Sequence, residues 1–99
     1  MKYDIVQDNT KLSVKLEGEL DTRTSPEFER ALIPALKGIT EVDLDLEGLH
    51  YISSAGLRLL LAAEQTLEEK QGKLTVRNVD ENVMDVFKVT GFDDVLHIV

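Results

Sequence analysis

The sequence contains no cysteine and no tryptophan, and only 2 of its residues are histidines. Without cysteine, the chain can form neither a disulfide bond nor a thiolate metal site. His50 and His97 lie far apart and neither has another ligand at metal-binding spacing, so we expect no metal and no cofactor. A glycine-rich loop ending in Lys-Ser or Lys-Thr is also missing, which excludes a P-loop for phosphate.

Long apolar runs are absent as well. The longest, Leu59–Ala63, is far too short to cross a bilayer. The N-terminal stretch MKYDIVQDN lacks the apolar centre of a signal peptide. We therefore expect a soluble cytoplasmic protein with no membrane partner.

Basic residues are few, since 11 lysines and arginines stand against 19 aspartates and glutamates, for a formal charge of -8. Affinity for nucleic acid comes mainly from Lys and Arg contacts to phosphates, so we expect no nucleic-acid partner. An acidic surface is compatible with a basic protein partner. Because the 99 residues include no linker, repeat or low-complexity segment, residues 1–99 are predicted to form a single domain.

Five segments alternate apolar and polar residues with a period of two, which predicts strands with one buried face. These segments are KLSVKLEG (11–18), TEVDLDLEG (40–48), the residues around Tyr3 and Ile5, those around Leu74 and Val76, and Val95–Val99. In the second segment Asp43 and Asp45 fall on the polar side, and we expect both to be solvated. Such regular alternation predicts a sheet that is covered on one face and wet on the other.

Three stretches between these strands have the periodicity of amphipathic helices. The predicted helices are TSPEFERALIPALKG (24–38), the stretch from about Ser54 to Lys70, and the stretch after Asp80 that ends at a left-handed cap on Gly91. In the first, Thr24 and Glu27 fit a capping box, and Pro34 should kink or end the helix. The order ββαβαβαβ predicts an α+β (α/β-like) domain, with a mixed sheet of about five strands and three helices packed on one face.

The stretch HYISSAGLRLLL places two adjacent serines at the start of the second helix. At 100° per residue, one helix stripe is entirely apolar and should face the core. That stripe contains Gly56, Leu60, Ala63 and Leu67, and a second stripe contains Ser54, Arg58, Leu61 and Gln65. Extrapolated back along the helix, Ser53 points toward the core. We therefore expect Ser53 to be inward and hydrogen-bonded, and Ser54 to face water.

Two interpretations of these serines remain open. Either hydroxyl could simply cap the helix, which contributes about 1 kcal/mol. Alternatively, a phosphate on Ser54, with a charge of about -1.5 to -2, would be stabilised by the helix N-terminus and by Arg58. A docked partner would not tolerate that charge. The small residues Ala55 and Gly56 fit close approach of a partner, but they equally fit tight packing on the sheet.

The stretch VDLDLEGLHYISSAGLRLLL resembles the signature of STAS domains, specifically the bacterial anti-sigma factor antagonists. LEGELDTRTSPEFERAL resembles the loop from their first strand to their first helix, and VFKVTGFDDVLHIV resembles their C-terminal helix and strand. The resemblance therefore spans nearly the whole chain. Where many relatives have Asp-Ser-Ser-Gly, this chain has Ser53-Ser54-Ala55-Gly56, with one charge fewer beside the acceptor.

The resemblance implies a partner-switching protein that is not an enzyme. In such families the antagonist binds an anti-sigma factor that is also a serine kinase of the histidine-kinase-like ATPase type, and binding frees the sigma factor. The kinase phosphorylates the antagonist and so releases it, and a PP2C-type phosphatase reverses that step. By motif position, the phosphoacceptor is Ser54. The expected partner-binding residues are Asp21, Thr22, Thr24, Ser53, Gly56, Leu57, Arg58 and Leu61, with Leu57 and Leu61 on an exposed helix edge.

Other activities fit the residues less well. STAS domains also serve as accessory subunits of lipid-transport ABC complexes, which would bind an ATPase without phosphorylation, and as parts of stressosome scaffolds. A third role, as the tail of an anion transporter, requires a membrane segment. A serine hydrolase is disfavoured because Gly-x-Ser-x-Gly is absent, with Ile52 where the first glycine is needed. His50, on the incoming strand, is poorly placed as a general base.

Overall fold

Five strands and three α-helices account for most of the chain in the computed structural model, which describes all of residues 1–99. The strands are β1 (Lys2–Asp8), β2 (Lys11–Leu20), β3 (Glu41–Ile52), β4 (Lys73–Arg77) and β5 (His97–Ile98). The helices are α1 (Ser25–Ala35), α2 (Ser54–Glu69) and α3 (Glu81–Thr90), and a 3-10 turn, η1, covers Phe92–Asp94. This order confirms the predicted ββαβαβαβ arrangement.

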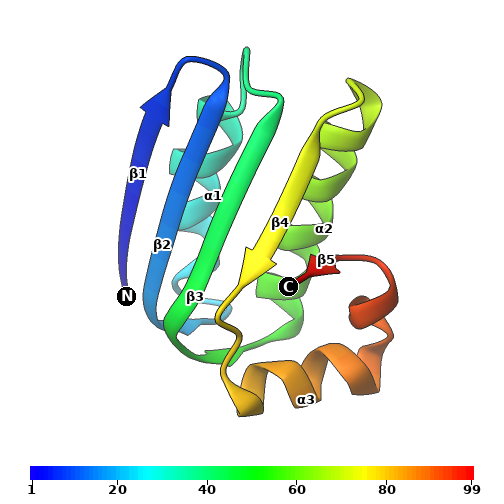
Figure 1. Cartoon of the computed structure of the whole chain (residues 1–99). Coiled ribbons are helices and arrows are strands. Elements are labelled where there is room, and N and C mark those ends of the chain that lie inside the picture. Colours follow the sequence, from blue (N-terminus) through cyan, green and yellow to red (C-terminus); the bar gives the residue numbers. More distant parts are fainter.

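The strands form one mixed sheet in the order β1-β2-β3-β4-β5 (Figure 1). β1 and β2 are antiparallel and are joined by a tight hairpin turn, whereas β2, β3, β4 and β5 all run parallel. Each parallel connection crosses over through a helix, as parallel neighbours require. The carboxyl ends of the parallel strands therefore meet at one end of the molecule, and α2 starts there.

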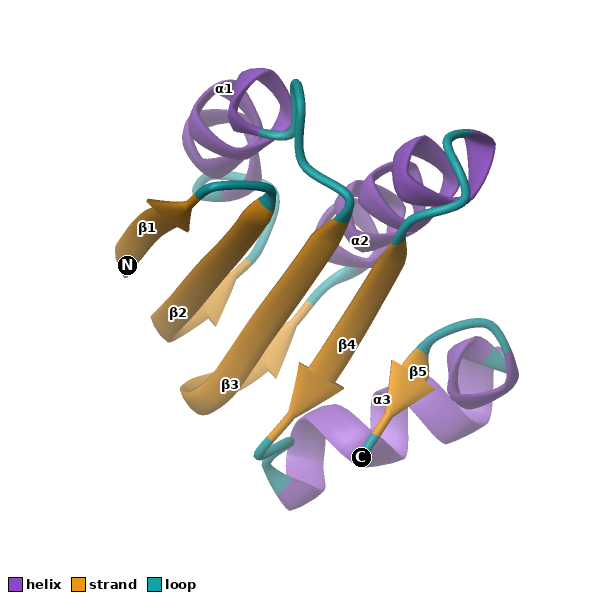
Figure 2. Cartoon of the chain, turned by 45° about the horizontal axis from the view of Figure 1, so that its top comes forward, coloured by secondary structure: helices purple, strands orange, loops and turns teal.

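The helices are not all placed alike. α1 and α2 lie side by side over one face of the sheet, as the sequence predicts (Figure 2). α3 instead lies across the carboxyl end of the strands (Figure 1). The connection from β4 to α3 spans only residues 78–80, so α3 begins close to that end of the sheet. None of the three helices is long and apolar enough to cross a membrane.

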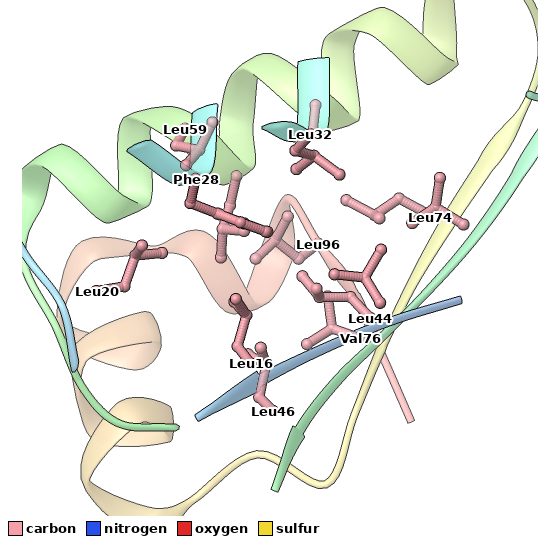
Figure 3. Packing of buried hydrophobic residues seen from close by; sticks show 14 of the residues in the cluster. Leu16, Leu20, Phe28, Leu32, Leu44, Leu46, Leu59, Leu74, Val76 and Leu96 are labelled. Atoms are coloured by element: carbon pink, nitrogen blue, oxygen red, sulfur yellow. The ribbon is translucent and has the colours of Figure 1, made fainter. Parts of the chain in front are cut away.

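The core fills the space between the covered sheet face and all three helices (Figure 3). Its largest side chains include Phe28 from α1 and Phe87 from α3, both fully buried. The apolar stripe predicted for α2 is confirmed, because its four members, Gly56, Leu60, Ala63 and Leu67, are all buried. α3 therefore closes the end of the same core rather than forming a second one.

On the uncovered face of the sheet, two aspartates of β3 have side-chain partners from the end of β4. Asp43 on β3 accepts a hydrogen bond from Arg77 Nε on β4 at 2.6 Å. Asp45 accepts from the side-chain amide of Asn78 at 3.1 Å and lies opposite Lys15 of β2. The two aspartates thus lie on the wet face, as predicted, and are paired there rather than free.

Some boundaries differ from the predicted ones. The last strand covers only His97–Ile98. The residues before it form η1 and a turn, and the strand pairs with β4 only at Thr75 and Val76. Pro34 lies in the final turn of α1, which ends one residue later. The third helix matches its prediction: the carboxylate of Asp80 accepts from the N–H of Asn82, and Gly91 ends the helix with φ of 81°.

Candidate functional site at the start of α2

Two loops meet where β2 and β3 end. Leu20 lies opposite Ile52 in the sheet, so the segments that follow these strands start as neighbours. The N–H of Ser53 donates to the carbonyl oxygen of Leu20 at 2.9 Å, which extends the pairing past the end of the sheet. The loop at residues 21–24 is thereby held beside the start of α2, as the resemblance implies.

A compact hydrogen-bond network shapes the 21–24 loop. The carboxylate of Asp21 accepts from the N–H of Arg23 at 2.9 Å and from the N–H of Thr24 at 3.0 Å. The hydroxyl of Thr24 donates to the carbonyl of Glu19 at 2.8 Å and accepts from the N–H of Asp21 at 2.9 Å. The hydrogen bond from the Thr24 N–H is the main reason that the pKa of Asp21 lies below its ordinary value of 3.8.

This network contradicts the predicted capping box. Thr24 occupies the N-cap position of α1, but its side chain makes no cap hydrogen bond. The hydroxyl is already engaged with the backbone of the strand before it. Asp21 and Thr24, both predicted partner contacts, therefore shape the loop from within, while Thr22 is fully exposed at its tip.

The two serines at the start of α2 have opposite environments. Ser54 is exposed, as are Arg58 and Gln65 of its stripe, so the face count is confirmed there. The hydroxyl of Ser53 is buried, which confirms its inward direction, yet it has no hydrogen-bond partner, so the predicted hydrogen bond is wrong. Its backbone is extended, with ψ of 178°, and its side chain makes no cap hydrogen bond to α2.

No side chain caps α2. Its first backbone bond runs from the N–H of Leu57 to the carbonyl of Ser53 at 2.9 Å. The N–H groups of the first turn have no intrahelical acceptor and carry the positive end of the helix dipole. Arg58 lies one turn further on, exposed and in no ion pair. Ser54 is thus surrounded by groups that favour negative charge, and the interpretation of Ser53 as a cap is excluded.

Two predicted contact residues are buried instead. Leu57 is only 5% exposed, so the exposed helix edge predicted to include it is wrong. Gly56 is also buried, and a Cβ there would lie 2.7 Å from Ile52 Cγ1 and 2.9 Å from the carbonyl oxygen of Leu20. Of the two explanations for this glycine, tight packing on the sheet is the one the structure supports. Leu61 is half-buried at the edge of the surface.

A shallow groove lies beside Ser54, between the first turns of α1 and α2. Its lining residues are Thr22, Ser25, Pro26, Glu29, Ala55, Arg58 and Leu59. The α1 side of this groove was not predicted. Pro26 and Glu29 are one turn apart on α1, a spacing that identifies a helix face but does not reveal that this face borders α2. The groove brings an acidic and a basic side chain, Glu29 and Arg58, to the same depression.

A second unpredicted feature connects the end of β3 to α3. His50 Nδ1 lies 3.0 Å from Asp80 Oδ2. The pKa of Asp80 lies below its ordinary value of 3.8. The hydrogen bond from His50 is the largest cause, and the hydrogen bond from the N–H of Asn82 is the next. Asp80 therefore caps α3 and also ties it to the strand that leads to Ser54. Its role as a helix cap was readable from the sequence, but a partner 30 residues away was not.

Comparison with known proteins identifies the family. Residues 4–99 match the family described as "Mlab, STAS domain". The chain belongs to the STAS domain family. The STAS domain is 34% identical over 86 residues to the anti-sigma-B factor antagonist of Staphylococcus epidermidis, a match that covers 86% of this chain and 80% of that protein.

Solved structures confirm the fold. The structure of the anti-sigma factor antagonist SpoIIAA in its unphosphorylated form superposes with a TM-score of 0.86 at 21% identity, covering 99% of this STAS domain and 88% of that chain. The phosphorylated form of SpoIIAA, described as a Bacillus cell fate determinant, gives a TM-score of 0.78 at 20% identity, covering 99% and 91%. At these identities, the likeness is one of fold.

Proposed function

We propose that this STAS domain is an anti-sigma factor antagonist controlled by phosphorylation of Ser54. In the unmodified state it binds an anti-sigma factor that is also a serine kinase of the histidine-kinase-like ATPase type, and so frees a sigma factor. Transfer of the γ-phosphoryl group of ATP to Ser54 Oγ releases the antagonist. A PP2C-type phosphatase hydrolyses the phosphoester and restores binding, and all of these partners meet in the cytoplasm.

The accessibility of Ser54 is the observation that carries this proposal. Its hydroxyl is exposed at the first position of α2, whereas the neighbouring hydroxyl of Ser53 is sealed in the core. A kinase can therefore reach one serine and not the other. The relative from Staphylococcus epidermidis, itself named an anti-sigma-B factor antagonist, supports the same function.

The surroundings of Ser54 explain how a phosphate would act as a switch. The uncapped first turn of α2 supplies N–H groups at the positive end of the helix dipole, which together stabilise an exposed negative charge by about 0.3–1 kcal/mol. Arg58 could add a charge-assisted hydrogen bond from one turn away. The free domain thus tolerates the phosphate, whereas a docked partner must desolvate it, which costs several kcal/mol per unpaired ion. The modification therefore changes binding and leaves the fold intact.

The docking surface in this proposal is smaller than the sequence indicates. Thr22, Ser54, Arg58 and Leu61 are exposed or half-buried and can contact a partner directly. Asp21 and Thr24 position the loop beside them. The groove between α1 and α2 extends this surface toward Glu29. Few residues are needed, since a small central group usually dominates binding at interfaces of this kind.

The test is affinity capture from cells with three baits, followed by mass spectrometry. The unmodified domain and Ser54→Ala should both retain the kinase, and phosphate should be found on Ser54 of the unmodified domain alone. Ser54→Asp should keep its circular dichroism spectrum and lose the kinase. Thr40→Asp, which adds the same charge at the exposed residue before β3, is the matched control and should bind normally.

Two results would contradict the proposal. Phosphate on Ser53 in the Ser54→Ala variant would show that the buried hydroxyl of Ser53 can be the acceptor. Undiminished capture by Ser54→Asp would mean that charge at this position does not control docking. That second result would favour an accessory or scaffold subunit that binds its ATPase without phosphorylation.

A further inference from the structure

One edge of the sheet is long, regular and unpaired. β1 contributes seven residues, and its pairing with β2 runs without a bulge from Lys2 opposite Glu17 to Asp8 opposite Lys11. No other element lies beyond it (Figures 1 and 2). Such an edge presents a row of free N–H and C=O groups, which is a template for another strand. The edge also displays apolar surface, with the side chain of Val6 55% exposed.

We propose that a second copy of this chain docks on this edge, with the two β1 strands antiparallel and paired about Ile5. The pairing would join two five-stranded sheets into one continuous sheet of ten strands. This interaction is independent of the proposed antagonist function, because it uses no residue of the Ser54 site.

The order of charges along β1 selects both the occupant and the register. Centred on Ile5, the pairing places Lys2 of each copy opposite Asp8 of the other, giving two ion pairs by symmetry. Centring on Asp4 would place Asp4 against itself, and centring on Val6 would place Asp4 opposite Asp8. Like charges directly opposite each other destabilise a sheet, so the neighbouring registers are disfavoured. A strand of unrelated sequence would match this order only by coincidence.

The two faces of the edge also match in this register. Antiparallel copies related by a two-fold axis perpendicular to the sheet keep covered faces together and wet faces together. On the covered side, Ile5 would meet Ile5, extending the core that it already contacts. Tyr3, whose ring lies 5.4 Å from that of Phe28 on α1, would lie opposite Gln7. On the wet side, this register places Val6 of each copy opposite Asp4 of the other, and the partner's β1 strand would cover part of the exposed surface of Val6.

The arrangement leaves both Ser54 sites accessible. Ser54 follows the carboxyl end of β3, whereas the docking surface is the lateral edge at β1 (Figure 1). In an antiparallel dimer the carboxyl ends of the two sets of parallel strands point in opposite directions. Each copy would therefore present its Ser54 surface at a separate end of the ten-stranded sheet.

The experiment measures the mass of the full chain in solution by light scattering over a series of concentrations. The unmodified chain should approach twice 11.1 kDa as concentration rises. Lys2→Asp and Asp8→Lys should each stay monomeric, because each replaces both ion pairs with like charges. An equimolar mixture of the Lys2→Asp and Asp8→Lys chains restores two opposite-charge pairs between unlike copies, with no further change opposite β2 in either chain, and should dimerise again. Circular dichroism checks that all variants are folded.

The controls change charge equally at other places. Lys37→Asp, in the exposed turn after α1, and Asp93→Lys on η1 alter the net charge as the two single variants do, and both should dimerise like the unmodified chain. A chain that remains monomeric at every concentration would overturn the proposal. So would a dimer that persists in both single variants, which would place the interface elsewhere, or an equimolar mixture of the two single variants that stays monomeric.

Discussion

The N–H of Ser53 donates to the carbonyl oxygen of Leu20 at 2.9 Å, and this bond holds the segment that carries Ser54 against the end of β2. The carbonyl oxygen of Leu20 is also one of the atoms that a Cβ at residue 56 would meet. The position of Ser54 therefore depends on a backbone contact that tolerates no side chain at residue 56. The sequence encodes this contact as a single glycine in the first turn of α2.

Replacing Gly56 with alanine should destabilise the domain. A Cβ would lie 2.9 Å from the carbonyl oxygen of Leu20 and 2.7 Å from Ile52 Cγ1, closer than such atoms approach. The gain in helix propensity is about 1 kcal/mol, but overpacking a core costs typically 1–3 kcal/mol, and backbone atoms cannot rotate away. We expect urea denaturation to show a net loss of about 1 kcal/mol. Ala55→Gly serves as the control, because it measures the difference in helix propensity between alanine and glycine in the same turn of α2. A stabilised Gly56→Ala variant would show that the contact is easily relieved.

Asp21 should affect partner binding through the shape of its loop. Asp21→Ala removes the acceptor of two backbone N–H groups, from Arg23 and Thr24, and should weaken binding of the kinase at least several-fold while the domain stays folded. Asp21→Asn keeps an acceptor oxygen in the same place and should bind nearly as well as the unmodified domain. Calorimetric titration of both variants separates these cases. Equal weakening by Ala and Asn would instead mean that the charge of Asp21 contacts the partner.

The fold was largely predictable because its signals are local. Alternating residues identify the strands, and the stripe from Gly56 to Leu67 identifies the buried side of α2. The same count separates the inward Ser53 from the outward Ser54. These predictions hold because a helix or strand exposes one face to water whatever its neighbours are.

The errors arose where a contact outside the pattern of a single helix or strand decides the outcome. Leu57 was expected at an exposed edge, yet it is buried. Thr24 has the spacing of a helix cap, but the carbonyl of Glu19 takes its hydroxyl first. The His50–Asp80 pair and the α1 side of the groove have no local pattern at all. Contacts of this kind depend on how the elements pack, which spacing along one element does not specify.

Glu64 on α2 should make the domain less stable at neutral pH than at mildly acidic pH. Its Oε2 is buried without a hydrogen-bond partner, and burial, assisted by the negative charge of Glu68, raises its pKa above the ordinary value of 4.5; His97 opposes this shift. The folded state therefore holds the proton more tightly than the unfolded state does. The contribution of Glu64 to stability is fully present below pH 4.5 and is lost as the pH rises through the raised pKa.

Glu64→Gln removes this titration and should stabilise the domain at pH ~7, with little difference from the unmodified chain below the ordinary carboxyl pKa. Thermal unfolding at several pH values measures the effect. Glu69→Gln, an exposed change of the same charge on the same helix, is the matched control and should give no comparable gain. A Glu64→Gln variant that is less stable at neutral pH would mean that the carboxylate has a favourable partner.

Asp80 should show the opposite pH dependence. Its pKa lies below 3.8 because it accepts hydrogen bonds from His50 and from the N–H of Asn82. Its stabilising contribution is therefore present above pH 3.8 and is lost as the pH falls through the lowered pKa. Asp80→Ala removes both bonds and should lower the unfolding midpoint at neutral pH, with the difference shrinking in acid. Asp85→Ala, an exposed aspartate on the same helix, serves as control. If the two variants unfold alike at every pH, the tie between β3 and α3 does not stabilise the fold.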